Sequence, residues 1–147
     1  MTYDLKVERL IDATPEEVFD AFVDDDAMKE WYRLQPDWTA TVDSYDPKVG
    51  GTTSITFGGD EHYREDIAYT ELDRPKRIAY TETMRRLPEG QGSMVTTVVV
   101  TFEAQGGKTL VTLEQLGFED AARRDAHQGG WPQFLARLDE VVRARVA

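Results

Sequence analysis

A stretch near the end of the chain, Trp-Pro-Gln-Phe-Leu-Ala-Arg-Leu-Asp-Glu-Val-Val-Arg-Ala-Arg-Val at residues 131–146, constrains how the rest of the sequence can fold. Its apolar side chains recur at helical spacing: Trp131, Phe134, Leu135, Leu138, Val141, Val142 and Val146. This pattern predicts a long amphipathic helix whose single apolar face needs a partner. Gly129, Gly130 and Pro132 disfavour helix, so we expect a break or a kink where the helix begins.

Residues 38–118, which precede this helix, alternate between apolar and polar side chains, as half-buried strands do. Turn residues rich in glycine and proline, including a turn around Gly90, divide them into six predicted strands. These strands lie near residues 38–45, 52–57, 62–72, 76–85, 94–103 and 108–116. The short connections between them are typical of hairpins and predict an antiparallel meander.

Near the start of the sequence, the pattern changes once from that of a strand to that of a helix. Tyr3–Ile11 alternate and predict a further strand, whereas Thr14-Pro15-Glu16-Glu17 has the hydroxyl, proline and glutamate of a capping box. A helix is therefore predicted to begin at Pro15. The run Asp24–Asp26 ends that helix and offers a cap for a second short helix through Trp31. We interpret the run as a solvated junction between the two helices.

The resulting order is one strand, two short helices, six strands and a long helix, which predicts an α+β domain spanning residues 1–147. Only the terminal helix is long enough to cover the apolar face of the sheet. A helix laid across a strongly curved sheet contacts it best near the helix ends. We therefore expect a cavity between the two.

Composition excludes several classes of function. The absence of cysteine rules out a disulfide framework, a thiolate zinc site and a cysteine nucleophile. A formal net charge of −11 disfavours nucleic acid and anionic membranes as partners. His62 and His127 are the only histidines and lack the spacing of a metal site, so we expect no metal and no cofactor. With no apolar leader and no run of ~18 apolar residues, a cytoplasmic protein without membrane contact is predicted.

Five short segments, in order along nearly the whole chain, carry a resemblance to a known family. They are residues 10–22, Met28-Lys29-Glu30-Trp31, Lys48-Val49-Gly50-Gly51, residues 71–78, and Gly130-Trp131 with Leu135 and Leu138. The sequence resembles the activator of heat shock protein 90 ATPase homologue-like family, within the START-like (SRPBCC) helix-grip superfamily. Two departures are Lys48, where the family has arginine, and Arg74, where it has the first of two prolines.

The resemblance implies a helix-grip fold: a curved antiparallel sheet of about seven strands wrapped around a long C-terminal helix, with two short helices after the first strand and an enclosed pocket. Many relatives bind apolar or aromatic small molecules, some modify them, and some act on the chaperone. Chaperone activators of this kind have an additional N-terminal domain, for which 147 residues leave no room.

The strand alternation places several polar side chains on an otherwise apolar inner wall. They are Tyr63, Glu65, Tyr69, Tyr80, Glu82 and Gln115. Together with Phe57, Trp131 and Phe134, we expect them to line a ligand site. The alternative is that the tyrosines are core aromatics with hydroxyls at the rim. Trp31 and Trp131 are interpreted more readily as packing at the two ends of the grip than as an aromatic cage.

Glu65 and Glu82 allow two interpretations. As a buried pair they could carry out general acid and base catalysis. Alternatively, one or both lie at strand ends in water or pair with an arginine, for which the candidates are Arg64, Arg85 and Arg86. Because no nucleophile with an oriented base is evident, no catalytic residue is assigned.

Three hypotheses of function follow. The first is binding of an apolar or aromatic small molecule between sheet and helix, without chemistry. The second is a stress-related protein that contacts a chaperone, as the resemblance suggests. The third is a cofactor-free cyclase, hydrolase or isomerase that uses Glu82 and Glu65. The sequence leaves open whether two copies form a homodimer.

Overall fold

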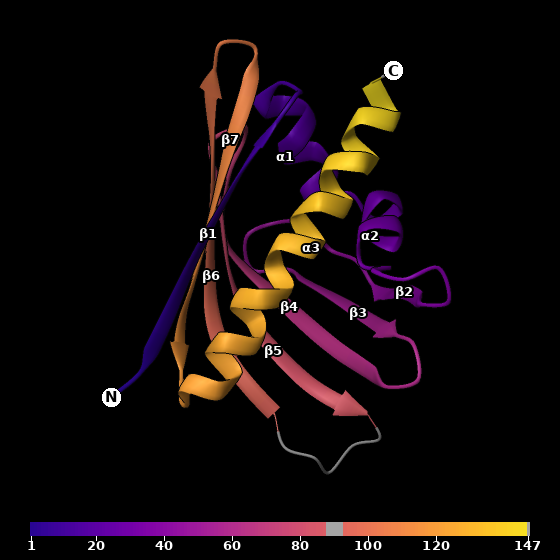
Figure 1. Ribbon diagram of the computed structural model, residues 1–147, viewed down its shortest axis with the longest axis vertical. Helices are drawn as coiled ribbons and strands as arrows, with labels where there is room; N and C mark the ends of the chain where they lie inside the picture. The colour runs from indigo at the N-terminus through magenta and orange to yellow at the C-terminus, as the bar shows by residue number, and fades with distance from the viewer. Residues whose placement is uncertain (88–92, 147) are drawn as a thin grey trace.

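The molecule is built around one antiparallel sheet, and the computed structural model describes residues 1–87 and 93–146 (Figure 1). Its strands are β1 (Tyr3–Ile11), β2 (Thr39–Ser44), β3 (Thr52–Gly58), β4 (His62–Asp73), β5 (Arg77–Leu87), β6 (Ser93–Gln105) and β7 (Lys108–Phe118). Their order is β1-β7-β6-β5-β4-β3-β2, so β2 to β7 each pair with their neighbours in sequence. The predicted meander is confirmed, and the turn expected around Gly90 lies outside the described residues.

Turn chemistry fixes the hairpin between β6 and β7. Gly106 and Gly107 have φ angles of +58° and +84°, which L side chains rarely adopt. Two consecutive positive φ angles are what a tight two-residue hairpin turn requires, because its twist matches that of the strands. The strands on either side pair from Gln105 with Lys108 onward.

Two short helices, α1 (Pro15–Val23) and α2 (Asp25–Trp31), follow β1 as predicted. The Thr14 hydroxyl accepts a hydrogen bond from the Glu17 amide at 3.2 Å, and the Glu17 carboxylate accepts one from the Thr14 amide at 2.9 Å. The capping box therefore forms. It sets the start of α1 at Pro15, because the amides of Thr14 and Glu17, which lack partners within the helix, bond to side chains instead.

The capping box should contribute measurably to stability. We expect Thr14→Ala to lower the free energy of unfolding by about 1 kcal/mol, because the Glu17 amide loses its acceptor. Chemical denaturation measures this loss. Thr14→Ser retains the hydroxyl and serves as the control, with stability close to that of the wild type. Equal losses in both variants would contradict the assignment.

Helix α3 (Ala121–Val146) is longer than predicted and runs without interruption past Pro132 (Figure 1). The expected break is wrong. Asp120 Oδ1 accepts a hydrogen bond from the Arg123 amide at 2.7 Å and satisfies a free donor at the start of the helix. Beyond the glycines, buried Trp131, Leu135 and Leu138 hold the helix to the sheet. Tertiary packing of this face outweighs the weak helix propensity of the preceding residues.

The core lies between the inner face of the sheet and α3, with α1 and α2 beside the C-terminal half of α3 (Figure 1). Strand residues predicted to face inward are buried, among them Ile55, Ile67, Val100 and Leu113. The predicted register of β4 is confirmed, because Glu65, Ile67 and Tyr69 are buried while Ala68 and Thr70 are exposed. Within the described residues, no helix is both long and apolar enough to cross a membrane.

Candidate functional site

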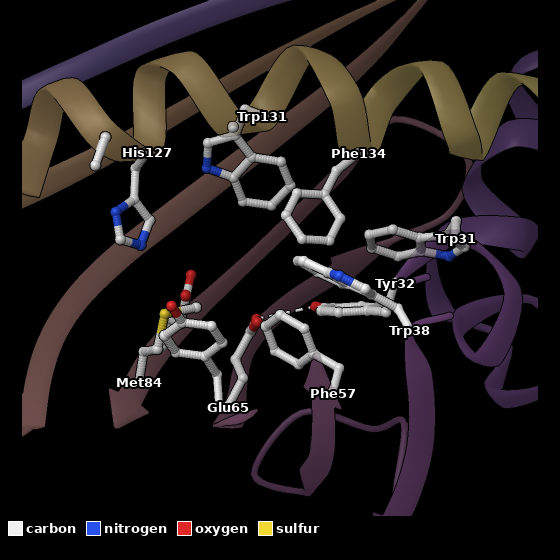
Figure 2. A pocket seen from close by; sticks show the side chains of 13 residues that line it. Trp31, Tyr32, Trp38, Phe57, Glu65, Met84, His127, Trp131 and Phe134 are labelled. Atoms are coloured by element: carbon white, nitrogen blue, oxygen red, sulfur yellow. Dashed lines mark hydrogen bonds between the residues drawn. The ribbon is translucent and has the colours of Figure 1, made fainter. Parts of the chain in front are cut away.

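A cavity of about 340 Å³ lies between α3 and the inner face of the sheet (Figure 2). Its residues come from three places in the fold. Helix α3 supplies Ala126, His127, Gly130, Trp131 and Phe134; the sheet supplies Phe57, Tyr63, Glu65, Glu82 and Met84; the end of α2 and the segment after it supply Trp31, Tyr32 and Trp38. The cavity therefore exists because α3 crosses a curved sheet and α2 closes one side.

Aromatic rings form most of the cavity wall. The ring of Tyr32 lies 4.5 Å from that of Trp31 and 5.0 Å from that of Phe57, measured between centroids. Phe134 continues the wall, with its ring 5.5 Å from Tyr32 and 5.8 Å from Trp131. Contacts of this kind position the rings against one another. They offer an apolar ligand a rigid surface.

Two carboxyl groups interrupt this apolar wall. Glu65 and Glu82 are only 3% and 1% exposed. Glu65 pairs across the sheet with Met84, which places it beside the strand that carries Glu82. The Tyr32 hydroxyl donates a hydrogen bond to Glu65 Oε1 at 3.0 Å (Figure 2). A few polar groups in an apolar cavity are typical of a ligand site.

Gln115 links the second carboxyl group to the helix. Its Nε2 donates to Glu82 Oε2 at 3.1 Å and to Thr96 Oγ1 at 2.8 Å. Its Oε1 accepts a hydrogen bond from Trp131 Nε1 at 2.8 Å. These bonds orient the side chains of Glu82, Thr96 and Trp131. The Gln115 amide itself has one orientation that fits, because its oxygen faces the Trp131 donor and its nitrogen faces two acceptors.

Burial shifts the protonation of both carboxyl groups. It raises the pKa of Glu65 from 4.5 to about 7, although the hydrogen bond from Tyr32 acts in the opposite direction. Burial, followed by the charge of Glu65, raises the pKa of Glu82 well above its usual value. Two carboxylates close together in an apolar site are costly to ionise at once. The site therefore favours the protonated form of each carboxyl group more than water does.

The tyrosines divide into two groups. Tyr63 lines the cavity and donates to Glu61 Oε2 at 3.1 Å, whereas Tyr69 lies deeper and donates to Thr53 Oγ1 at 3.0 Å. Tyr80 is also buried behind the cavity, and its hydroxyl has no hydrogen-bond partner among the described residues. Burial raises the pKa of Tyr69 to about 12 and that of Tyr80 well above 10, so both phenols stay neutral.

Six of the nine residues expected at the site border the cavity: Trp131, Phe134, Phe57, Tyr63, Glu65 and Glu82. The other three, Tyr69, Tyr80 and Gln115, lie behind it in the sheet, where Gln115 supports the lining. The alternative that the glutamates lie in water or pair with arginine is wrong. Arg64 and Arg85 instead pair with Asp66, and Arg86 pairs with Glu61.

Sequence reasoning missed several lining residues. Tyr32 lies just beyond the predicted second helix, and Trp38 begins the predicted strand near residues 38–45. His127 and Gly130 lie before the predicted start of the last helix. The sequence does contain a signal for His127 and Gly130. His127, Gly130, Trp131 and Phe134 follow helical spacing and would have extended the stripe toward the N-terminus, had the glycines not suggested a break.

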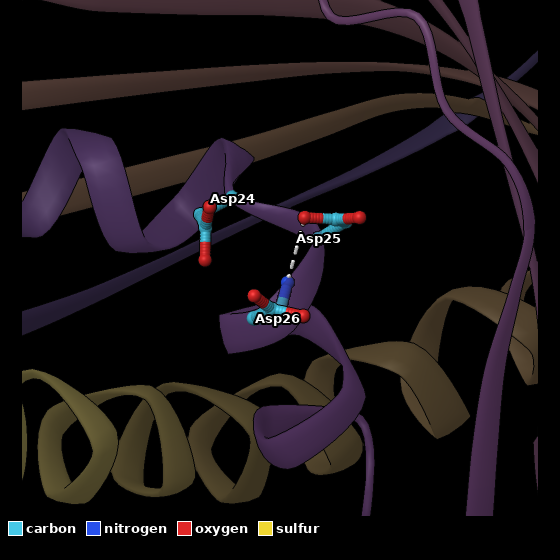
Figure 3. A group of neighbouring side chains, drawn as sticks. All are labelled: Asp24, Asp25 and Asp26. Carbon is cyan, nitrogen blue, oxygen red and sulfur yellow. Dashed lines mark hydrogen bonds between the residues drawn. The ribbon is translucent and has the colours of Figure 1, made fainter.

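The acidic junction between α1 and α2 serves as a cap. Carboxylate oxygens of Asp24, Asp25 and Asp26 lie within 4.8 Å of one another (Figure 3). Asp24 Oδ2 accepts a hydrogen bond from the Ala27 amide at 3.0 Å and another from Arg145 Nη1 at 3.3 Å. The predicted cap of α2 is confirmed. These contacts give the run a structural role.

The curved sheet around a long C-terminal helix, with a cavity between them, defines a protein of the helix-grip class. The model of the family described as Activator of Hsp90 ATPase homolog 1-like protein matches residues 12–143, and the chain belongs to this family. Comparison with curated proteins gives no match.

Solved structures share this fold over almost the full length. A crystal structure of a protein from Chromobacterium violaceum is 25% identical, with a TM-score of 0.82 over 95% of this chain and 96% of that one. The solution structure of the AHSA1-like protein from Aeromonas hydrophila is 23% identical, with a TM-score of 0.78 over 97% and 94%. A solution structure from Staphylococcus epidermidis is 21% identical, with a TM-score of 0.80 over 99% and 92%.

Proposed function

We propose that the protein binds an apolar or aromatic small molecule in the cavity between α3 and the sheet. The observation that carries this proposal is a cavity of about 340 Å³ walled by the rings of Trp31, Tyr32, Trp38, Phe57, Tyr63, Trp131 and Phe134. A volume of this size lies at the lower end of the range for small-molecule sites, about 300–1,000 Å³. Apolar surface removed from water supplies the affinity, and the two carboxyl groups orient the ligand.

The three tryptophans give a direct test. All three tryptophans of the chain border the cavity, so a ligand there should alter the intrinsic fluorescence. We expect native mass spectrometry of freshly purified protein to detect a retained small molecule. After removal of that molecule, titration with phenylbutanol should change the tryptophan emission to saturation. No retained mass together with no saturable response would contradict the proposal.

Glu82→Gln separates binding from chemistry. The amide keeps the shape of the side chain and part of its hydrogen bonding. For a binding protein, affinity for neutral phenylbutanol should therefore change by less than about tenfold. Calorimetric titration measures this change. A larger loss would contradict the expectation that Glu82 only orients the ligand.

A second candidate function, acid and base catalysis, is favoured by one observation. Glu65 has a pKa raised to about 7 and lies in the cavity with Glu82, so one carboxyl could donate a proton while the other accepts one. For such an enzyme, Glu82→Gln should reduce turnover by about 10²–10⁴-fold while binding survives. A chaperone contact is supported by the family description alone.

A further inference from the structure

We propose that the cavity selects an organic cation: an ammonium group carried on an apolar or aromatic body, with the nitrogen held at Glu65 among the aromatic rings. This inference rests on the proposed function and adds the chemical class of the ligand. Three features of the site support it, namely the charge of its lining, the nature of its walls and the hydrogen bonding of its carboxyl groups.

The lining has an asymmetric charge. Among the described residues that border the cavity, Glu65 and Glu82 are acidic and none is lysine or arginine. Of the described lining residues, His127 alone could become positive, and burial lowers its pKa from 6.5, which favours the neutral ring at neutral pH. A ligand carboxylate would face two acidic side chains without a cation to pair with. An ammonium group would meet the opposite sign.

The aromatic walls favour the same charge. The faces of Trp, Tyr and Phe rings carry negative partial charge and attract cations within about 6 Å. Seven such rings border one cavity with two carboxyl groups. This combination of rings and acids is suited to an ammonium group, since the rings replace part of its water shell while the carboxylate supplies the countercharge.

The positions of the hydrogen-bond donors identify Glu65 as the ion partner. The Tyr32 hydroxyl donates to Glu65 Oε1, an interaction that stabilises a carboxylate. Glu82 Oε2 also accepts a hydrogen bond, but its donor is Gln115, which lies behind the cavity and holds Trp131, whereas Tyr32 belongs to the aromatic wall. A cation bound at Glu65 would favour its ionised form and remove the cost of an uncompensated buried charge.

Nearby arginines could favour an anion instead, but their charge is compensated. A neighbouring hollow of about 320 Å³ contains Arg85, Arg86 and Arg123 and shares Tyr63, Met84 and His127 with the cavity. Arg85 pairs with Asp66 at 3.0 Å, Arg123 pairs with Asp120 at 3.6 Å, and Arg86 pairs with Glu61. The net charge of −11 further attracts cations to the molecule.

Three probes of nearly equal shape test the inference: phenylbutylamine, phenylbutanol and phenylbutyrate. We expect the amine to bind at least about tenfold more tightly than the alcohol, equivalent to about 1.4 kcal/mol, and the carboxylate to bind most weakly. Tryptophan fluorescence and calorimetric titration at neutral pH measure all three affinities. If none of the probes binds, the proposed function fails. If the alcohol equals the amine, or the carboxylate binds most tightly, only the cation inference is overturned.

Two variants locate the charge. Glu65→Gln should reduce the preference for amine over alcohol, measured as the ratio of the two affinities in the same variant, to less than about threefold. Glu114→Gln, on the outer face of β7, removes one negative charge at an exposed position and serves as the control. The preference of Glu114→Gln for amine over alcohol should equal that of the wild type. An equal loss in both variants would attribute the effect to net charge and overturn the site at Glu65.

A measurement on the unaltered protein avoids dependence on the folding of any variant. Amine affinity should increase from about pH 6 to about pH 8 as Glu65 ionises, whereas alcohol affinity should not. Among the described residues, the other titratable groups that act on Glu65 or border the same cavity are Tyr32, Tyr63, Tyr69, Tyr80, Glu82, Asp66 and His127. The phenols stay neutral over this range, and the pKa of Asp66 is lowered, so this carboxylate stays ionised. Amine affinity that is constant with pH, or that decreases, would overturn the inference.

Discussion

Replacing Trp131 with alanine is expected to lower the free energy of unfolding by about 3–5 kcal/mol. The side chain is 7% exposed and contacts Phe134, so truncation removes much of its buried apolar surface and enlarges the existing cavity. It also removes the hydrogen bond from Nε1 to Gln115 Oε1, which is left buried without a donor. Chemical denaturation of the wild type and the variant measures the loss.

Trp131→Phe is the matched control for this prediction. Phenylalanine keeps an aromatic ring in the wall but cannot donate to Gln115. Its loss should therefore be about 1–3 kcal/mol, the cost of a buried acceptor left without its donor. If Trp131→Ala loses less than about 1 kcal/mol, the ring does not hold α3 to the sheet.

The second large effect is a loss of stability as the pH rises. Folding raises the pKa of Glu65 from 4.5 to about 7, so between these values the folded state keeps a proton that the unfolded state releases. The stabilisation is fully present below about pH 4.5 and is lost as the pH rises through 7. This rise in the pKa of Glu65 corresponds to about 3 kcal/mol.

Glu65→Gln removes this contribution. The amide cannot ionise, so the variant should lose about 3 kcal/mol less than the wild type between about pH 5 and about pH 9. Glu82 acts in the same direction, because its pKa is also raised, and His127 acts in the opposite direction, because its pKa is lowered. Both groups are retained in the variant, and because the charge of Glu65 contributes to the raised pKa of Glu82, the difference from the wild type also contains the interaction between the two carboxyl groups. Equal pH dependence in wild type and variant, measured by denaturation at each pH, would show that Glu65 is not buried as a neutral acid.

Local patterns predicted most of the fold. β1 has the predicted bounds, and α1 begins at the predicted proline, because alternation and a capping box act over a few residues. The inward-facing residues of each strand were predicted for the same reason, since each burial pattern has a period of two. The start of α3 could not be predicted in this way. Its continuity through Gly129, Gly130 and Pro132 depends on packing that only the folded sheet provides.

The candidate site was predictable where it depends on strand alternation. Glu65 and Glu82 were assigned to the inner wall from their spacing alone, and both are buried there. Local patterns did not show how far each side chain lies from the cavity, so Tyr80 and Gln115 were grouped with the lining residues. Tyr32 was missed because its position depends on how α2 docks against α3. That contact joins residues about 100 positions apart.

The pairing of β1 with β7 has a consequence for the order in which the molecule can assemble. β2 to β7 can form one hairpin after another as the chain is synthesised, because each pairs with its neighbour. β1 pairs in the sheet with β7 alone, and Ile11 must meet Thr109 across the whole intervening chain. Closing so long a loop is slow, and an unpaired strand invites intermolecular contacts meanwhile. During translation, the N-terminal strand therefore stays without its sheet partner until nearly the entire meander has left the ribosome.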